Sequence, residues 1–181
     1  MLQSMASLPA ADSAAALFSA DFYLPYAAAA QTALSALCAA RRLLVLDTGE
    51  DVVAFTYRLK SPASIRGKLL LRGLPVSEEA AHAALHDVAG LRVVLRSVSQ
   101  VYRFAELLAR SPLLQLADER DYISAPKRSG YRSLHLLFTV PAPPGTQGAA
   151  VPVEIQLRTA AMDIWASIEH RLIYKPAGAS V

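Results

Sequence analysis

The stretch Asp121-Tyr-Ile-Ser-Ala-Pro-Lys-Arg-Ser-Gly-Tyr-Arg-Ser-Leu-His135 organises the rest of the chain. It begins as a strand, breaks at Pro126, and resumes as a strand from Arg132. Proline lacks the N–H that a sheet ladder needs, and glycine adopts conformations closed to other residues, so together they interrupt the strand pattern. The pattern therefore predicts two strands joined by a loop.

The side chains of this loop suit a nucleotide. Lys127 offers a cation to phosphate, Gly130 lets the backbone approach a ligand closely, and Tyr131 offers a flat face for a base. His135 follows four residues later, with Ser133 on the same strand face because side chains alternate. An ordinary Pro-Gly hairpin with solvated charges explains the same residues, so the loop alone leaves both interpretations open.

Composition favours a folded cytosolic chain. Of the 181 residues, 54% are hydrophobic and 18% are charged, which is typical of a globular domain rather than a disordered segment. The one cysteine, Cys38, excludes an intrachain disulfide and fits a reducing compartment. A net charge of +3 is too small to indicate nucleic-acid binding.

The N-terminal part favours neither a signal peptide nor a membrane span. No Lys or Arg precedes Arg41, so the positive region of a signal peptide is missing. Polar residues interrupt the apolar run 27–46, which argues against a transmembrane helix. We therefore expect a cytoplasmic protein that has no membrane partner.

Periodicity and turn residues predict five strands interleaved with helices, which is an α+β fold with a mixed sheet. Residues 1–46 form an N-terminal helical segment, and residues 47–181 form the main domain of a chain that is globular as a whole. On the last helix Ile164, Trp165 and Ile168 recur at helical spacing, which predicts core positions. The strands are expected at 51–60, 86–95, 118–124, 132–140 and 151–157, and the helices at 24–46, 61–71, 77–86, 98–110 and 160–175.

Two carboxylates accompany the predicted strands. Glu154, Gln156 and Arg158 share one face of the fifth strand by period two, and Asp87 stands at the start of another apolar strand. Mg²⁺ in nucleotide sites takes one or two carboxylates together with phosphate oxygens. Two unrelated surface acids fit the spacing equally, so the spacing alone does not decide.

A basic cluster follows the first strand, where a helix begins. Free N–H groups at that helix terminus would add to the attraction of phosphate for the cations. A solvated basic face is the alternative. The cluster comprises Arg58, Lys60, Ser64, Arg66 and Lys68.

A zinc site is a weaker possibility. His82 and His86 stand four residues apart on a helix and precede Asp87, and histidines at this spacing can chelate zinc. Only His135 and His170 remain as further histidine ligands, which disfavours zinc.

Together these segments resemble the synthetase domain of the RelA/SpoT family, and most closely its stand-alone small alarmone synthetases. No single segment carries the resemblance, but the five occur in family order over most of residues 58–175. They are Arg58–Lys68, Asp87–Arg92, Asp121–His135, Glu154–Thr159, and Trp165–His170 with Tyr174 and Lys175.

The resemblance implies a nucleotidyltransferase-like sheet and an activity. The enzyme would transfer pyrophosphate from ATP to the ribose 3′-hydroxyl of GDP or GTP with Mg²⁺, giving ppGpp or pppGpp and AMP. By position, the family roles fall as follows: adenine between Arg58 and Arg92; ATP phosphates on Ser64 and Lys68; Mg²⁺ on Asp87 and Glu154; guanine on Tyr131; the rest of the acceptor beside Lys127, Ser129 and His135; and activation of the 3′-hydroxyl by Glu154.

Departures from the family pattern predict simpler regulation. The chain stops soon after Lys175, where oligomeric relatives continue into helices that build a tetramer, and no cation precedes Arg41. Asp163 stands where relatives often carry a neutral amide, and it would repel a phosphate-rich effector. We expect a monomer or dimer without alarmone feedback and without a hydrolase domain.

Two other functions stay open. A toxin-type relative would pyrophosphorylate the 3′ end of tRNA, which needs an extended basic surface. An inactive nucleotide-binding regulator is disfavoured because Lys68, Asp87, Tyr131 and Glu154 are all present. The sequence does not distinguish GDP, GTP and GMP as acceptors.

Overall fold

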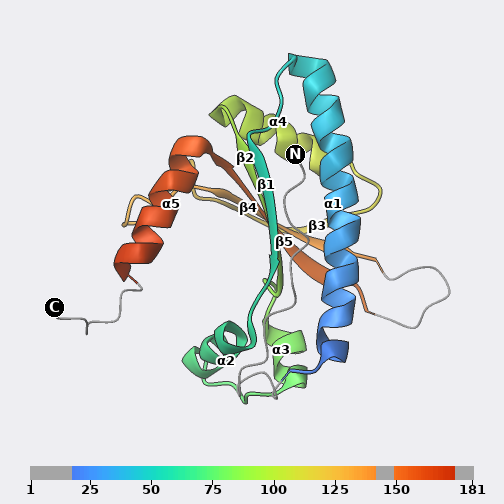
Figure 1. The fold of residues 1–181 in the computed structure, drawn as a ribbon, viewed down its shortest axis with the longest axis vertical. Coiled ribbons are helices and arrows are strands. Elements are labelled where there is room, and N and C mark those ends of the chain that lie inside the picture. Colours follow the sequence, from blue (N-terminus) through green and yellow to red (C-terminus); the bar gives the residue numbers. More distant parts are fainter. Residues whose placement is uncertain (1–17, 142–148, 174–181) are drawn as a thin grey trace.

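A mixed five-stranded sheet forms the centre of the molecule, with strands in the order β1-β2-β5-β4-β3 (Figure 1). The computed structural model describes residues 18–141 and 149–173. The predicted α+β fold with a mixed sheet is confirmed. The strands are β1 (Ala54–Leu59), β2 (Ala89–Leu95), β3 (Gln115–Asp121), β4 (Leu134–Val140) and β5 (Val151–Thr159), and the helices are α1 (Ala20–Thr48), α2 (Pro62–Leu71), α3 (Glu78–Ala84), α4 (Val98–Ala109) and α5 (Ala160–Ile173).

Some predictions fall outside the described residues. These are residues 1–17 of the N-terminal segment, the loop tip at 142–148, and the last motif positions, Tyr174 and Lys175.

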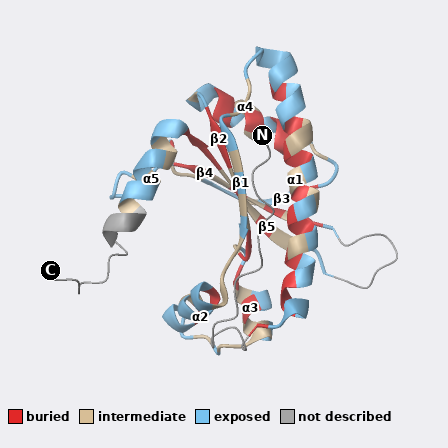
Figure 2. Ribbon diagram, viewed as in Figure 1, coloured by how far each residue is buried: buried red, intermediate tan, exposed pale blue. Residues whose placement is uncertain are grey.

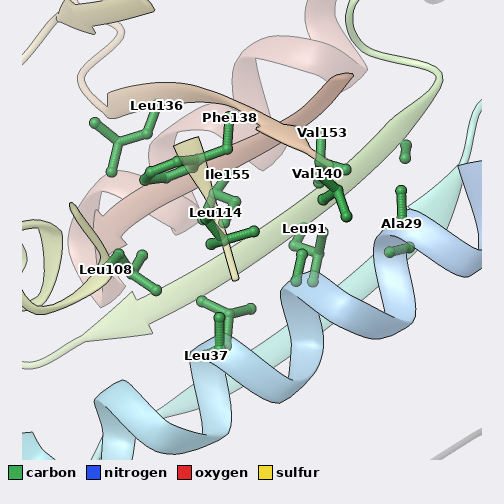
Figure 3. Close-up of a cluster of buried hydrophobic side chains, with 14 of the residues drawn as sticks. Ala29, Leu37, Leu91, Leu108, Leu114, Leu136, Phe138, Val140, Val153 and Ile155 are labelled. Atoms are coloured by element: carbon green, nitrogen blue, oxygen red, sulfur yellow. The ribbon is translucent and has the colours of Figure 1, made fainter. Parts of the chain in front are cut away.

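One face of the sheet carries the core. β2 and β5 are parallel, and the other neighbouring strands are antiparallel. Apolar side chains alternate along β2, β4 and β5, as in Leu91, Leu136 and Ile155, and point to the same side. Figure 3 shows this cluster meeting Leu37 of α1 and Leu108 of α4. The opposite face of the sheet lacks this helical cover and is therefore available for a site.

Helix α1 packs along the core face of the sheet and against α4 (Figure 1). Its length and composition would let it cross a membrane. However, the buried residues form one stripe, from Phe22 and Tyr26 through Ala33 and Leu37 to Leu44, and Figure 2 shows that stripe facing the sheet. The alanines in the stripe let the helix approach the strands closely, so α1 is a core helix.

Serines set the start of four helices. Ser19, Ser61, Ser77 and Ser97 each accept a hydrogen bond from the backbone N–H three residues along the chain. Such a cap satisfies one of the N–H groups that a helix terminus leaves unpaired. The chain therefore turns into these helices at sites that the sequence itself marks.

The third strand lies three residues earlier than the predicted 118–124. The carboxylate of Asp121 accepts hydrogen bonds from the backbone N–H groups of Ile123 (2.8 Å) and Ser124 (3.1 Å). This local turn ends the strand at Asp121, because an Asp side chain competes with the ladder for backbone donors.

The prediction that Ile164, Trp165 and Ile168 belong to the core is wrong. These side chains are 62%, 49% and 47% exposed. Helix α5 contacts only β5 and β2 among the elements of the sheet, and α1 and α4 already cover the core face. Figure 2 accordingly shows the described part of α5 without buried residues.

Candidate active site

The open face of the sheet aligns polar side chains in two neighbouring rows. Strand register places Arg58, Gly90, Glu154 and Leu137 side by side in the first row. The second row runs through Thr56, Arg92, Gln156, His135 and Arg120. Paired residues of adjacent strands point to the same face, so the register alone gathers residues from five strands.

Asp87 lies just before β2, between two lysines. Lys60 Nζ donates to its Oδ2 at 2.9 Å, and Lys68 Nζ donates to the same oxygen at 2.7 Å. Burial favours the neutral acid, but the hydrogen bond from Lys68 and the charge of Lys60 outweigh it, so the pKa of Asp87 lies below its usual value. The other oxygen, Oδ1, is buried and has no hydrogen-bond partner among the described residues.

Glu154 receives two hydrogen bonds, one on each oxygen. His135 Nδ1 lies 3.1 Å from Oε1, and Gln156 Nε2 donates to Oε2 at 2.7 Å. Burial would raise the pKa of Glu154, and the charge of Asp87 also raises it, but the bonds from His135 and Gln156 bring the net pKa below the usual value. The carboxylate is therefore ionised at neutral pH, and it lies near enough to Asp87 to sense its charge.

The loop between β3 and β4 gathers an aromatic and cationic group. Lys127 Nζ lies 4.7 Å from the ring centre of Tyr122 and 4.9 Å from that of Tyr131. The Tyr131 hydroxyl lies 2.7 Å from His135 Nε2. Gly130 has φ of 82°, which only glycine adopts without strain, and its backbone lies against the Trp165 indole. Ser129 is exposed in the same loop.

The donor side is built from β1, β2 and α2. Arg58 is exposed on β1, and Arg92 is half-buried beside it on β2. Ser64 lies in the first turn of α2, where its hydroxyl accepts a hydrogen bond from Ser61 Oγ at 2.9 Å. Burial lowers the pKa of Arg92, and the nearby Arg158 cation lowers it further. This crowding of cations favours an anionic or electron-rich ligand.

Two residues of the site were not predicted from the sequence. Asp163 of α5 accepts a hydrogen bond from Arg158 Nη1 (3.2 Å) and forms a salt bridge with Arg92 Nη1 (3.2 Å). Its charge is therefore engaged within this network. Arg158 shares the predicted polar face of the fifth strand with Glu154, which is the one signal in the sequence that pointed to it.

Two hollows meet at the carboxylates. The one on the β1 side is lined by Arg58, Gly90, Arg92 and Gln156, and the one on the β4 side by Lys68, Arg72, Asp118 and His135. Asp87 and Glu154 line both. The site can therefore hold two ligands, one on each side of a pair of carboxylates.

The histidines of the possible zinc site have other surroundings. The ring of His82 stacks on Tyr26, and its Nδ1 lies 2.8 Å from the Tyr26 hydroxyl. His86 lines the hollow on the β4 side. Within residues 18–141 and 149–173 no group of three or more His, Cys, Asp or Glu side chains is placed to hold a metal ion.

Comparison with known proteins gives a consistent family match. The sequence profile described as "Region found in RelA / SpoT proteins" matches residues 57–179. The chain is 39% identical over 118 residues to GTP pyrophosphokinase YwaC and 36% identical over 158 residues to GTP pyrophosphokinase YjbM, both of Bacillus subtilis. These matches cover 65% and 87% of this chain, and 56% and 74% of the respective relatives.

A solved structure shares the fold. The small alarmone synthetase 1 from Bacillus subtilis, bound to its product pppGpp, matches with a TM-score of 0.76 and 34% sequence identity. The match covers 88% of this chain and 81% of that chain.

Proposed function

Because this chain belongs to the RelA/SpoT family, we propose that it is a GTP/GDP pyrophosphokinase. It transfers pyrophosphate from ATP to the ribose 3′-hydroxyl of GDP or GTP, and forms AMP with ppGpp or pppGpp. The relatives named above supply the activity, and the arrangement of this chain's own residues supplies the support for it.

The observation that carries the proposal is the position of Asp87 and Glu154 between two hollows. A transfer between two nucleotides needs both bound at once, with the reacting groups in line. A donor on the β1 side and an acceptor on the β4 side would meet at the two carboxylates. A site for a single ligand would not require a second hollow that shares the same acids.

The carboxylates fit a Mg²⁺ ion. Asp87 Oδ1 is buried and has no hydrogen-bond partner among the described residues, and such an oxygen is costly unless a cation or water reaches it. Two carboxylates leave room for the phosphate oxygens and waters that Mg²⁺ prefers as further ligands. Asp87 and Glu154 would hold the ion, which neutralises phosphate charge and makes a bound hydroxyl more acidic.

The protein's contribution is mainly positioning and charge. Arg58 and Arg92 flank the place for adenine, and Ser64 and Lys68 face the place for the donor phosphates. Lys60 and Lys68 already neutralise Asp87 and would exchange part of that interaction for phosphate.

On the acceptor side, Tyr131 offers its ring to guanine, with Lys127, Ser129 and His135 around it. Glu154 is ionised and accepts the hydrogen bond of the 3′-hydroxyl. A carboxylate with a lowered pKa is a weak base, so it orients the hydroxyl and takes its proton as the bond to phosphorus forms.

Turnover with a matched pair of variants tests the proposal. The purified chain is incubated with ATP, Mg²⁺ and either GDP or GTP, and the products are separated by anion exchange. We expect ppGpp or pppGpp together with AMP. Glu154→Ala should reduce kcat by about 10²–10⁴-fold, whereas Glu119→Ala, an exposed change on β3, should leave it unchanged.

Other outcomes identify the alternatives. Absence of alarmone but labelling of deacylated tRNA from ATP would replace this function by the tRNA reaction. Nucleotide binding without any transfer would indicate a regulator. The acceptor preference follows from the same assay, and sedimentation velocity tests the predicted monomer or dimer. We infer a cytoplasmic location, because ATP, GTP and a free thiol at Cys38 all suit that compartment.

A further inference from the structure

Arg158 is a buried cation that contacts most of the polar network behind the site. Its side chain is 5% exposed, and its Nε donates to Ser133 Oγ at 3.3 Å. Its Nη1 donates to Asp163 at 3.2 Å. A buried guanidinium is retained only where its donors are satisfied, and here they are satisfied by residues that lead to Glu154.

The first connection runs through Tyr131 and His135. Arg158 Nη2 lies 2.6 Å from the Tyr131 hydroxyl, and a guanidinium only donates, so the hydroxyl oxygen accepts. The single hydroxyl hydrogen is then free to point to His135 Nε2, 2.7 Å away, which must accept. A neutral imidazole that accepts at Nε2 carries its proton on Nδ1, and that nitrogen lies 3.1 Å from Glu154 Oε1.

The second connection runs through Gln156. Arg158 Nη2 also donates to Gln156 Oε1 at 2.8 Å. This bond fixes the orientation of the amide, so its nitrogen faces Glu154 Oε2 and donates at 2.7 Å. The two hydrogens of one nitrogen atom thus set the direction of both bonds that reach the two oxygens of Glu154.

We propose that Arg158 is the positioning residue that fixes the proton arrangement around Glu154, and in particular holds His135 in its Nδ1–H tautomer. The role of Glu154 rests on the proposed function, but the tautomer of His135 does not. With both oxygens accepting from protein donors, the carboxylate is held in one rotamer and in the ionised form. Each oxygen keeps a lone pair for a ligand on the open side.

The same arrangement assigns different consequences to loss of Arg158 and to loss of a neighbour. Without the guanidinium, the Tyr131 hydroxyl can turn and accept from His135 Nε2–H, and the Gln156 amide can flip. His135 then presents an unprotonated Nδ1 to Glu154, and two acceptors face each other. A merely structural arginine would lower stability without changing which nitrogen of His135 carries hydrogen.

Nitrogen-15 NMR of imidazole-labelled protein measures this directly at pH 8. The two ring nitrogens have distinct shifts and couplings in the Nδ1–H, Nε2–H and doubly protonated forms. The spectra are assigned with His135→Gln and compared among wild type, Arg158→Gln and Tyr131→Phe. Arg103→Gln, which removes an exposed arginine paired with Asp47 away from the site, is the control.

We expect the Nδ1–H form in wild type and in Arg103→Gln, and its loss in Arg158→Gln and in Tyr131→Phe. In turnover assays Arg158→Gln should lower kcat by about 10–100-fold, the usual effect of removing a group that orients a site ligand, and change KM for ATP much less. If Arg158→Gln does not fold, Tyr131→Phe still tests the first connection, because it keeps the ring and removes only the hydroxyl.

An Nε2–H or doubly protonated His135 in the wild type overturns the proposal. An unchanged tautomer in both Arg158→Gln and Tyr131→Phe overturns it as well. Absence of alarmone synthesis by the wild type would refute the proposed function instead, and would leave the NMR result to stand on its own.

Discussion

Replacing Asp163 by asparagine removes one negative charge from between two arginines and changes almost nothing in shape. Asp163 Oδ1 lies 3.2 Å from Nη1 of Arg92 and 3.2 Å from Nη1 of Arg158, and the Asp163 side chain is 28% exposed. The Nε of Arg92 is already buried without a partner among the described residues. The variant therefore leaves two neighbouring cations without their shared counterion.

The magnitude follows from these contacts. A hydrogen bond to a charged group contributes about 1.5–3 kcal/mol, but asparagine keeps one acceptor oxygen and solvent screens part of the charge. Asp163 also lies in the first turn of α5, where a negative charge contributes about 0.3–1 kcal/mol. We expect Asp163→Asn to lower the free energy of unfolding by about 2 kcal/mol.

Urea unfolding followed by circular dichroism measures the loss, with the slope m checked for constancy. Asp47→Asn is the matched control, because Asp47 forms an exposed pair with Arg103 at 2.7 Å and such pairs contribute little. A double-mutant cycle with Arg92→Gln should give a coupling of about 1 kcal/mol or more. Equal losses for the two Asp→Asn variants, or no coupling with Arg92, would refute the bridging role of Asp163.

Three further changes test separate parts of the site and core. Lys68→Met removes one of the two cations on Asp87, and should lower kcat/KM for ATP by about 10–100-fold in steady-state kinetics, since each charge-assisted contact is worth about 1.5–3 kcal/mol; an unchanged kcat/KM would remove Lys68 from the donor site. Gly130→Ala meets no clash, because the nearest atom to a new Cβ is 3.5 Å away on Trp165, but φ of 82° strains alanine by about 1–2 kcal/mol, so KM for GTP should rise while KM for ATP holds. Burial raises the pKa of Tyr26 to about 12, from 10.0 in an unfolded chain. Stability from this group is complete below pH 10 and declines as pH rises toward 12, which tyrosinate absorbance and urea titrations at each pH would reveal; a Tyr26 that ionises near 10 in the folded protein would contradict it.

Local chemistry explains why much of the fold was predictable. Ser61 and Ser77 mark helix starts because a side-chain oxygen caps a free N–H, and this bond forms within three residues of sequence. The alternation of Val153, Ile155 and Leu157 with Glu154 and Gln156 is likewise a local consequence of the pleat. Such patterns depend on near neighbours, so the sequence carried them without the rest of the chain.

The exposed face of α5 shows where that reasoning ends. Ile164, Trp165 and Ile168 have the spacing of a buried stripe, but spacing gives only their common face and not what covers it. Helix α5 contacts only β5 and β2 in the sheet, whose core face α1 and α4 already occupy. Burial is decided by neighbours far along the chain, so the periodicity alone gave the wrong answer.

The sequence by itself determined which residue types were available to the site, from Lys68 and Asp87 to Tyr131 and Glu154. Only the tertiary structure decided how they meet. The parallel pairing of β2 with β5 sets Gly90 beside Glu154 and so brings Asp87 near that carboxylate. The directions of the hydrogen bonds around Glu154 are decided by Arg158, because a donor-only group fixes its neighbours only when the folded chain holds them within reach.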